Sequence, residues 1–325
     1  MTLRIIDGGL STQLEAQGVN LKEHPKLWTA GLLSSTDGRA ELLKAHSAFI
    51  EAGADIVLTS SYQTSPDLAQ DLLSASVHLA LEARDTARAL GRPIDVFLSL
   101  GPWGATQADG SEYTGVYPPS ATKAFLSKFH ASRLSLLLKD EKENSIDGLA
   151  FETIPSQLEL SSILPLLSSP PYSSIPAWIT FSSNDGVLCC DGSLLSTAIE
   201  MCLSSFAAGP TEAPRWLGLN CVHPESVDAF LDSILPILET STVAGVVLYP
   251  NNGGTWNAET RCWCELEGTS DVTDGTCSDG YTQKAKEWRD RIINGEKGGK
   301  DLMIGGCCST DARTIKKLRE CLLGN

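Results

Sequence analysis

The chain has 325 residues, of which 42% are hydrophobic and 20% are charged, a balance typical of a globular protein with a large core. Its formal net charge of −15 excludes the basic surface that a nucleic acid requires, so we expect no nucleic-acid partner. No apolar run approaches the roughly 20 residues of a membrane span, and the stretch 1–7 lacks the apolar core of a signal peptide, so we expect a cytoplasmic protein without membrane contact.

Short apolar runs alternate with longer amphipathic stretches along the chain. The apolar runs predict strands at 4–9, 54–62, 94–102, 147–153, 177–182, 216–221, 245–251 and 302–308. After a first helix start at 11–15, helices are predicted at 36–52, 66–91, 120–140, 155–167, 194–207, 224–238, 282–293 and 310–323. This alternation predicts an α/β fold, a (β/α)8 TIM barrel forming a single domain over 1–325, with a cysteine-containing insert at 261–281. A doubly wound sheet is disfavoured because no Gly-x-Gly-x-x-Gly motif follows the first strand.

Chemically active side chains stand where the predicted strands end. In a barrel these ends meet at one face, which carries the active site. That face would collect Asp7, Ser60 to Tyr62, Gly101 and Pro102, Glu152, Cys221, Tyr249 to Asn251, and Cys307 and Cys308. The seventh strand lies between the sixth, which ends at Cys221, and the eighth, which ends at Cys307 and Cys308. Three converging thiolates would form a zinc site with an open fourth position, which is typical of catalytic zinc; the alternative is that these cysteines are only small buried residues.

The other cysteines fit this site less well. Cys189 and Cys190 are expected in a loop as surface or packing residues, and Cys202 and Cys321 as buried residues of helices. Cys262, Cys264 and Cys277 could form a small structural metal knot, although a Cys-x-Cys spacing with one distant partner is a weak pattern. The five histidines are scattered, and we assign them no ligand role.

Eight short motifs, in order along the chain, resemble one known family. They are Ile6-Asp7-Gly8-Gly9, Thr59-Ser60-Ser61-Tyr62-Gln63, Gly101-Pro102-Trp103-Gly104-Ala105, Asp109-Gly110-Ser111-Glu112-Tyr113-Thr114-Gly115, Glu152-Thr153-Ile154-Pro155, Gly218-Leu219-Asn220-Cys221, Tyr249-Pro250-Asn251 and Gly305-Gly306-Cys307-Cys308. Together they resemble the homocysteine S-methyltransferases, in the branch that uses S-methylmethionine or S-adenosylmethionine. The resemblance implies a zinc-binding (β/α)8 barrel that methylates the thiol of L-homocysteine to give L-methionine.

The resemblance also implies roles for particular residues. The zinc ligands would be Cys221, Cys307 and Cys308. The amino-acid part of homocysteine would be held by Asp7 and Glu152, in a pocket lined by the regions of Gly8 and Ser61.

The expected methyl donor is a sulfonium cation, for which carboxylates and aromatic faces are suitable neighbours. The candidates are Tyr62, Trp103, Glu112 and Tyr113. The homocysteine sulfur would attack the methyl group in line, and a neutral thioether would leave without a catalytic acid. Trp103, where relatives often have Tyr or Phe, and the stretch 252–254, where Ser-Gly-Glu is common, depart from the family pattern and bear on the choice of donor.

Three other functions share parts of this pattern. A zinc-dependent hydrolase on a barrel is disfavoured, because such sites draw on histidine and the predicted strand ends offer none. A non-enzymatic zinc or thiol redox-sensing barrel would need the same cysteines. A related thiol or selenol methyltransferase would differ only in its acceptor.

Overall fold

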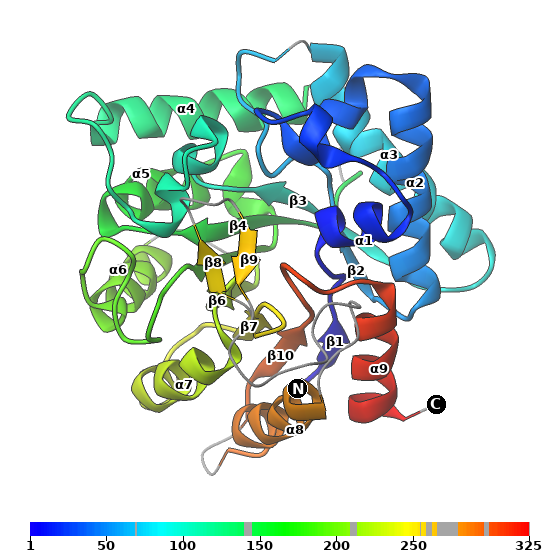
Figure 1. Ribbon diagram of the computed structural model, residues 1–325. Helices are drawn as coiled ribbons and strands as arrows, with labels where there is room; N and C mark the ends of the chain where they lie inside the picture. The colour runs from blue at the N-terminus through cyan, green and yellow to red at the C-terminus, as the bar shows by residue number, and fades with distance from the viewer. Residues whose placement is uncertain are drawn as a thin grey trace.

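The computed structural model describes residues 1–68, 70–139, 145–208, 213–253, 255–257, 262–264, 279–295 and 299–324. Eight strands form one parallel sheet in the order β1-β10-β7-β6-β5-β4-β3-β2. Their bounds are β1 Leu3–Ile5, β2 Ile56–Leu58, β3 Asp95–Leu100, β4 Gly148–Ile154, β5 Ala177–Phe181, β6 Arg215–Asn220, β7 Gly245–Tyr249 and β10 Asp301–Ile304. Figure 1 shows the helices arranged around these strands.

The two end strands of the sheet, β1 and β2, meet and close it into a barrel. The amide of Asp55 donates to the carbonyl of Ile5 at 2.7 Å, and the amide of Asp7 donates to that of Ile56 at 3.0 Å. A parallel bridge pairs Ile6 with Ile56 between these two bonds. This closure confirms the predicted (β/α)8 barrel, and it brings the carboxyl ends of all eight strands to one face.

The helices agree with the predicted ranges to within a few residues at each end. Their bounds are α1 Leu10–Ala16, α2 Thr36–Glu51, α3 Gln70–Ala89, α4 Lys123–Leu137, α5 Gln157–Leu167, α6 Leu195–Ala208, α7 Pro224–Leu238, α8 Asp279–Ile293 and α9 Ala312–Leu323. The largest difference is α3, which begins at Gln70 rather than at 66. Helix α5 begins after Pro155, because the hydroxyl of Ser156 accepts from the amide of Glu159 at 3.2 Å and caps the helix there.

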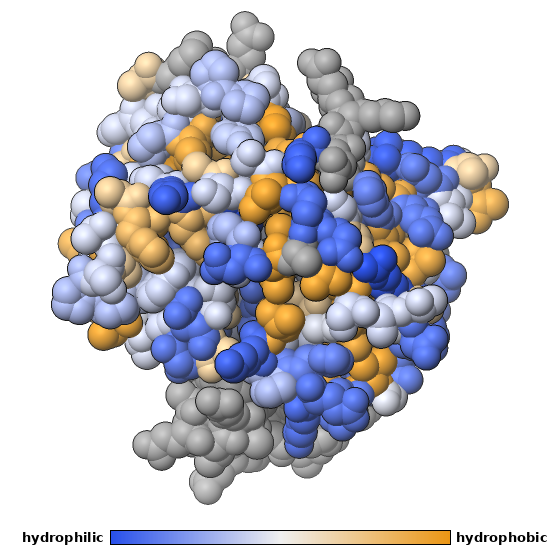
Figure 2. All heavy atoms as spheres, turned by 90° about the horizontal axis from the view of Figure 1, so that it is seen from above, coloured by the Kyte–Doolittle hydropathy of each residue, from blue (hydrophilic) through white to orange (hydrophobic). Residues whose placement is uncertain are grey.

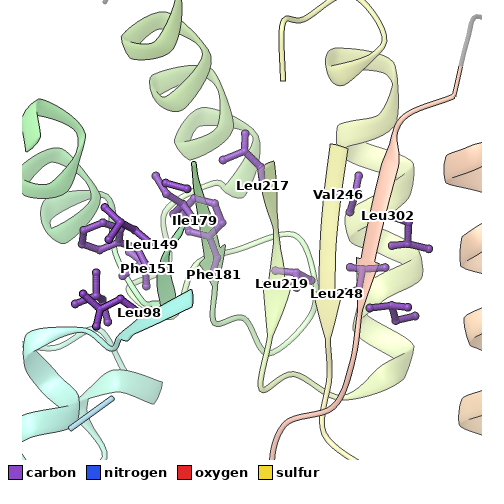
Figure 3. Packing of buried hydrophobic residues seen from close by; sticks show 14 of the residues in the cluster. Leu98, Leu149, Phe151, Ile179, Phe181, Leu217, Leu219, Val246, Leu248 and Leu302 are labelled. Atoms are coloured by element: carbon purple, nitrogen blue, oxygen red, sulfur yellow. The ribbon is translucent and has the colours of Figure 1, made fainter. Parts of the chain in front are cut away.

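Alternate residues of each strand pack on opposite sides of the sheet. Residues such as Trp216, Val247 and Met303 belong to one buried cluster, whereas their chain neighbours belong to a second, larger one. Because the sheet is closed, the smaller cluster fills the barrel and the larger one lies between strands and helices. Figure 3 shows part of the larger cluster beside the helices. Inside the barrel, the rings of Phe97 and Trp178 stack with their centroids 4.5 Å apart.

The predicted insert at 261–281 begins with part of a short antiparallel hairpin, formed by β8 (Thr255–Asn257) and β9 (Cys262–Cys264). The proposed metal knot of Cys262, Cys264 and Cys277 depends on side chains that lie outside the described residues. Within the part of the chain that the structure describes, no helix combines the length and apolarity needed to cross a membrane. On the face shown in Figure 2, hydrophobic side chains are interspersed among hydrophilic ones.

Candidate active site

Three thiols converge where β6 and β10 end. Cys221 directly follows β6, and Cys307 and Cys308 follow β10 after two glycines. All three sulfur atoms lie within 4.8 Å of one another, and the sulfurs of Cys221 and Cys308 are 3.3 Å apart. Among the described residues, this is the one group of three or more His, Cys, Asp or Glu side chains close enough to hold a metal ion.

The end of β7 holds both parts of this thiol cluster. The amide of Cys221 donates to the carbonyl of Tyr249 at 3.1 Å, and the amide of Cys307 donates to that of Pro250 at 2.9 Å. Cys221 has a φ of 54°, in the left-handed region that residues other than glycine rarely adopt. Because such backbone strain persists only where the surroundings impose it, we attribute it to the turn that directs this thiol toward the other two.

The Gly8-Gly9 turn after β1 packs directly against the thiol cluster. A Cβ atom on Gly9 would lie 2.3 Å from the carbonyl oxygen of Cys307, so only glycine fits there. The amide of Gly9 donates to the hydroxyl of Thr310 at 3.1 Å, and that hydroxyl in turn donates to the Cys307 carbonyl. A Cβ atom on Gly8 would lie 2.8 Å from the ring of Phe49. Both glycines therefore permit close packing beneath the thiols.

The sulfur atoms of the thiol cluster are close enough together to hold a metal ion. In tetrahedral zinc sites the Zn–S bonds are about 2.3 Å, which places neighbouring sulfurs about 3.8 Å apart. The sulfurs of Cys221 and Cys308 are 3.3 Å apart and no pair is separated by more than 4.8 Å, so the separations are compatible with that value. Hydrogen bonds from Cys307 and Cys308 hold the pKa of Cys221 well below its usual range, and the same bonds raise the pKa of both donors. The cluster already stabilises one thiolate.

Tyr113 reaches this cluster from the loop after β3. Its hydroxyl lies 3.6 Å from the sulfur of Cys221. Burial, followed by the nearby thiols of Cys221 and Cys308, raises the pKa of Tyr113 well above its usual value. The phenol therefore stays protonated and can donate a hydrogen bond to a thiolate.

Two buried carboxyl groups share the same face of the barrel. Asp7 and Glu152 are each 5% exposed. Asp7 accepts a hydrogen bond from the amide of Leu58 at 2.8 Å, and Glu152 accepts one from the hydroxyl of Ser99. Burial, together with the charge of Glu152, raises the pKa of Asp7 well above its usual value. Burial raises the pKa of Glu152 to about 7 despite bonds from Ser99 and Tyr249. A cationic ligand beside these two carboxyl groups would lower the pKa of both and favour their ionised forms.

A bulge in β4 orients Glu152. The pairing of β4 with β5 shifts register between Phe151 and Ile154, and Thr153 has a φ of 60°. Asn220 of β6 fixes this irregularity, because its Oδ1 accepts from the amide of Thr153 and its Nδ2 donates to the Thr153 hydroxyl, both at 2.7 Å. Bulges commonly redirect a side chain at active sites, and here the redirected side chain is Glu152.

Glu112 lies in the same loop as Tyr113. It is 8% exposed, and its Oε2 atom is buried without a hydrogen-bond partner. Burial, then repulsion from Asp109 and Cys221, raises its pKa to about 7. An unpartnered buried carboxylate is unfavourable unless a cation reaches it, so this group is available to a positively charged ligand.

The remaining predicted substrate residues differ in what surrounds them. The hydroxyl of Ser61 donates to the carbonyl of Ser99 at 2.7 Å. Tyr62 is half-buried with its hydroxyl atom buried, and burial, followed by the charges of Glu112 and Cys221, raises its pKa well above its usual value. The indole of Trp103 makes edge contacts with Tyr117 and Phe125, at centroid distances of 5.1 Å and 5.7 Å. These ring contacts pack the loop, and substrate binding by Trp103 stays a prediction.

Three buried polar residues of the strands support the thiols and carboxyls, namely Ser99, Thr180 and Asn220. The sequence assigned no role to any of them, although Asn220 belongs to one of the family motifs. A polar residue inside an otherwise apolar strand is the signal that could have identified them. Of the other cysteines, Cys189 and Cys202 are buried among apolar residues, as expected, and Cys190 is half-buried. Cys321, expected to be buried in its helix, is only half-buried.

Comparison with known proteins agrees with this geometry. Residues 4–322 match the family described as homocysteine S-methyltransferase. Homocysteine S-methyltransferase 4 of Zea mays is 36% identical over 334 residues, covering 97% of this chain and 87% of the relative. Homocysteine S-methyltransferase 1 of Arabidopsis thaliana is 34% identical over 333 residues, covering 97% and 91%. The metallated form of the homocysteine methyltransferase MmuM from Escherichia coli superimposes with a TM-score of 0.73 at 28% identity, covering 98% of this chain and 96% of that one. The chain therefore belongs to the homocysteine S-methyltransferase family.

Proposed function

We propose that this homocysteine S-methyltransferase uses a sulfonium, S-methylmethionine or S-adenosylmethionine, as methyl donor, and that it binds zinc through Cys221, Cys307 and Cys308. The observation that carries the proposal is the meeting of these thiols, within 4.8 Å of one another, with buried carboxyl groups on the same face. The family fixes homocysteine as the acceptor and favours methyl transfer over a non-enzymatic thiol function.

The donor set favours zinc over other common metal ions. Three soft thiolates suit zinc far better than magnesium or calcium, which prefer oxygen ligands. A zinc ion bound there would lower the pKa of the homocysteine thiol and keep its sulfur nucleophilic at neutral pH. The existence of a metallated form of the Escherichia coli relative supports metal binding by this chain.

Asp7 and Glu152 are the groups that we assign to the amino-acid part of homocysteine. Both carboxyls are nearly fully buried, and burial is what raises their pKa. An incoming ammonium group would favour the ionised form of both carboxyls. Homocysteine would thereby be oriented with its sulfur toward the thiol cluster, since both acids lie on the same face of the barrel.

The donor half of the site is assigned to the loop after β3 and to Tyr62. The buried carboxylate of Glu112, whose Oε2 atom has no hydrogen-bond partner, and the ring of Tyr62 suit a cation. In the reaction the homocysteine sulfur forms a bond to the methyl carbon while the sulfonium carbon–sulfur bond breaks. The leaving group is a neutral thioether, so it needs no proton. Positive charge disappears as the methyl group moves, and a buried site that excludes water therefore favours the transition state.

The test compares Cys307→Ala with the control Cys321→Ala, which removes a thiol from α9 away from the cluster. Zinc content and methionine formation are measured with S-methylmethionine, S-adenosylmethionine or betaine as donor. We expect the wild type and the control to hold one zinc ion per chain and to use a sulfonium but not betaine, and Cys307→Ala to lose both properties.

Two results would contradict the proposal. Full zinc occupancy in Cys307→Ala would show that the ligand assignment is wrong. Turnover with betaine alone would show that the donor class is wrong.

A further inference from the structure

Glu159 is a fully buried acid that the proposed chemistry does not use. It lies in the first turn of α5 with 0% exposure. One carboxylate oxygen accepts from the amide of Trp103 at 2.6 Å and pairs with Nε2 of His130 at 2.9 Å. The other accepts from the hydroxyl of Tyr117. The carboxylate thus binds both ends of the segment 103–117, which is the loop after β3.

Arg133 and His130 of α4 complete the group. The guanidinium of Arg133 donates to Nδ1 of His130 at 3.3 Å, and an arginine can only donate. Nδ1 is therefore the acceptor, and the ring proton lies on Nε2, which donates to Glu159. Arg133 is 0% exposed and also donates to the carbonyls of Gly101 at 2.6 Å and Thr64 at 3.4 Å. The buried group thereby connects the loop after β2 with the loop after β3.

The segment tied down in this way carries the donor half of the site. Glu112 and Tyr113 lie between the two positions that Glu159 binds, and Tyr113 lies against the thiol of Cys221. The segment has weaker anchors as well: the hydroxyl of Ser182 donates to the carbonyl of Glu112 at 3.0 Å, and the side-chain amide of Gln63 donates to the carbonyl of Ala105 at 3.5 Å. Movement of either end of the segment would move Glu112 and Tyr113 relative to the thiols.

We propose that Glu159 is a positioning residue for the methyl donor, because it holds the segment 103–117 over the thiol cluster. The inference rests on the proposed function, in which this segment contacts the sulfonium. A buried charged group is not by itself a source of stability, since an apolar replacement is often as stable. What an apolar replacement cannot do is fix the Trp103 amide and the Tyr117 hydroxyl to one carboxylate.

The experiment compares Glu159→Ala, Glu159→Gln and Tyr117→Phe with the wild type. The glutamine retains an oxygen that accepts from the Trp103 amide, whereas the alanine does not. Tyr117→Phe removes one bond to Glu159 and keeps the ring. The control is Arg215→Met, which removes a buried arginine at the start of β6, on the opposite end of the barrel. KM is measured separately for S-methylmethionine and for homocysteine, together with zinc content and amide hydrogen exchange of residues 101–117.

We expect Glu159→Ala to raise the KM for the donor at least tenfold and Tyr117→Phe to raise it about threefold. The KM for homocysteine and the zinc content should stay within twofold, Glu159→Gln should recover most of the donor affinity, and exchange in 101–117 should accelerate in the alanine variant only. The control should change none of these.

The inference would be overturned if Glu159→Ala raised the KM of both substrates equally. It would also be overturned if Glu159→Ala left both the donor KM and the hydrogen exchange of residues 101–117 unchanged. If Glu159→Ala does not fold, Tyr117→Phe decides by its KM values alone: a rise confined to the donor supports the inference, and an unchanged donor KM or an equal rise for both substrates overturns it. If the wild type methylates homocysteine with neither S-methylmethionine nor S-adenosylmethionine, the proposed function is refuted instead. The hydrogen-exchange measurement would still test whether Glu159 holds the segment 103–117.

Discussion

Asn220 connects the strand that ends at Cys221 with the bulge that presents Glu152, and its truncation tests whether this connection maintains the site. Asn220→Ala removes two hydrogen bonds to Thr153 and one from the hydroxyl of Thr180. The amide of Thr153, which is 1% exposed, is left buried and unpaired, at about 1–3 kcal/mol. The Thr180 hydroxyl keeps the Tyr249 hydroxyl as a hydrogen-bond partner at 2.8 Å, so it contributes little to the loss of stability. With about 1 kcal/mol for the remaining bond, we expect the free energy of unfolding to fall by about 2–4 kcal/mol.

The matched control is Thr180→Val, which has nearly the same shape and leaves the Thr153 amide paired with Asn220. We expect it to lose only about 1 kcal/mol. Urea denaturation followed by circular dichroism gives the stability, and kcat/KM for homocysteine gives the function. Because the bulge would relax, kcat/KM should fall at least tenfold in Asn220→Ala and less than threefold in the control. Equal losses in both variants, or a loss below about 0.5 kcal/mol in Asn220→Ala, would refute the reasoning.

Two further predictions concern positions outside this hydrogen-bonded group. Burial lowers the pKa of His46 to about 4, and neither ring nitrogen has a hydrogen-bond partner. The unfolded chain, with a pKa near 6.5, therefore binds the proton first, and stability is lost as the pH falls from about 6.5 to 4. We expect His46→Leu to abolish about 2 kcal/mol of this loss at pH 5, measured by urea denaturation at pH 5 and pH 7; an unchanged pH dependence would contradict it. Gly9→Ala would place a Cβ atom 2.3 Å from the Cys307 carbonyl. It should therefore displace that cysteine and reduce zinc content and turnover together, and retention of both would show that the turn adapts.

The barrel could be predicted from the sequence because its strands are short, apolar and regularly spaced. The order of strands also placed Cys221 near Cys307 and Cys308 without reference to coordinates, since the seventh strand lies between their strands in any such barrel. A parallel strand that is covered on both faces is a nearly uninterrupted run of apolar residues. Eight such runs alternating with helices identify the fold.

The support of the site could not be predicted, because it depends on contacts between residues far apart in sequence. Glu159 reads as an ordinary first-turn acid of a helix, a position where acids are common. Its bond to the Trp103 amide, 56 residues away, follows from how α4, α5 and the loop after β3 pack together. The left-handed backbone of Cys221 likewise has no local signal, because it is imposed by bonds to the end of β7.

The pairing of β1 with β10 has a consequence for how the protein is made. Asp7 is synthesised about 300 residues before Cys307 and Cys308, yet these residues end neighbouring strands. A growing chain therefore carries the Cys221 thiol for some 86 residues of synthesis before its partners exist. A metal ion held by all three thiols would bind only after the last strand docks, so a chain cut short before Cys307 would retain most of the barrel's strands and lack two of the three thiols.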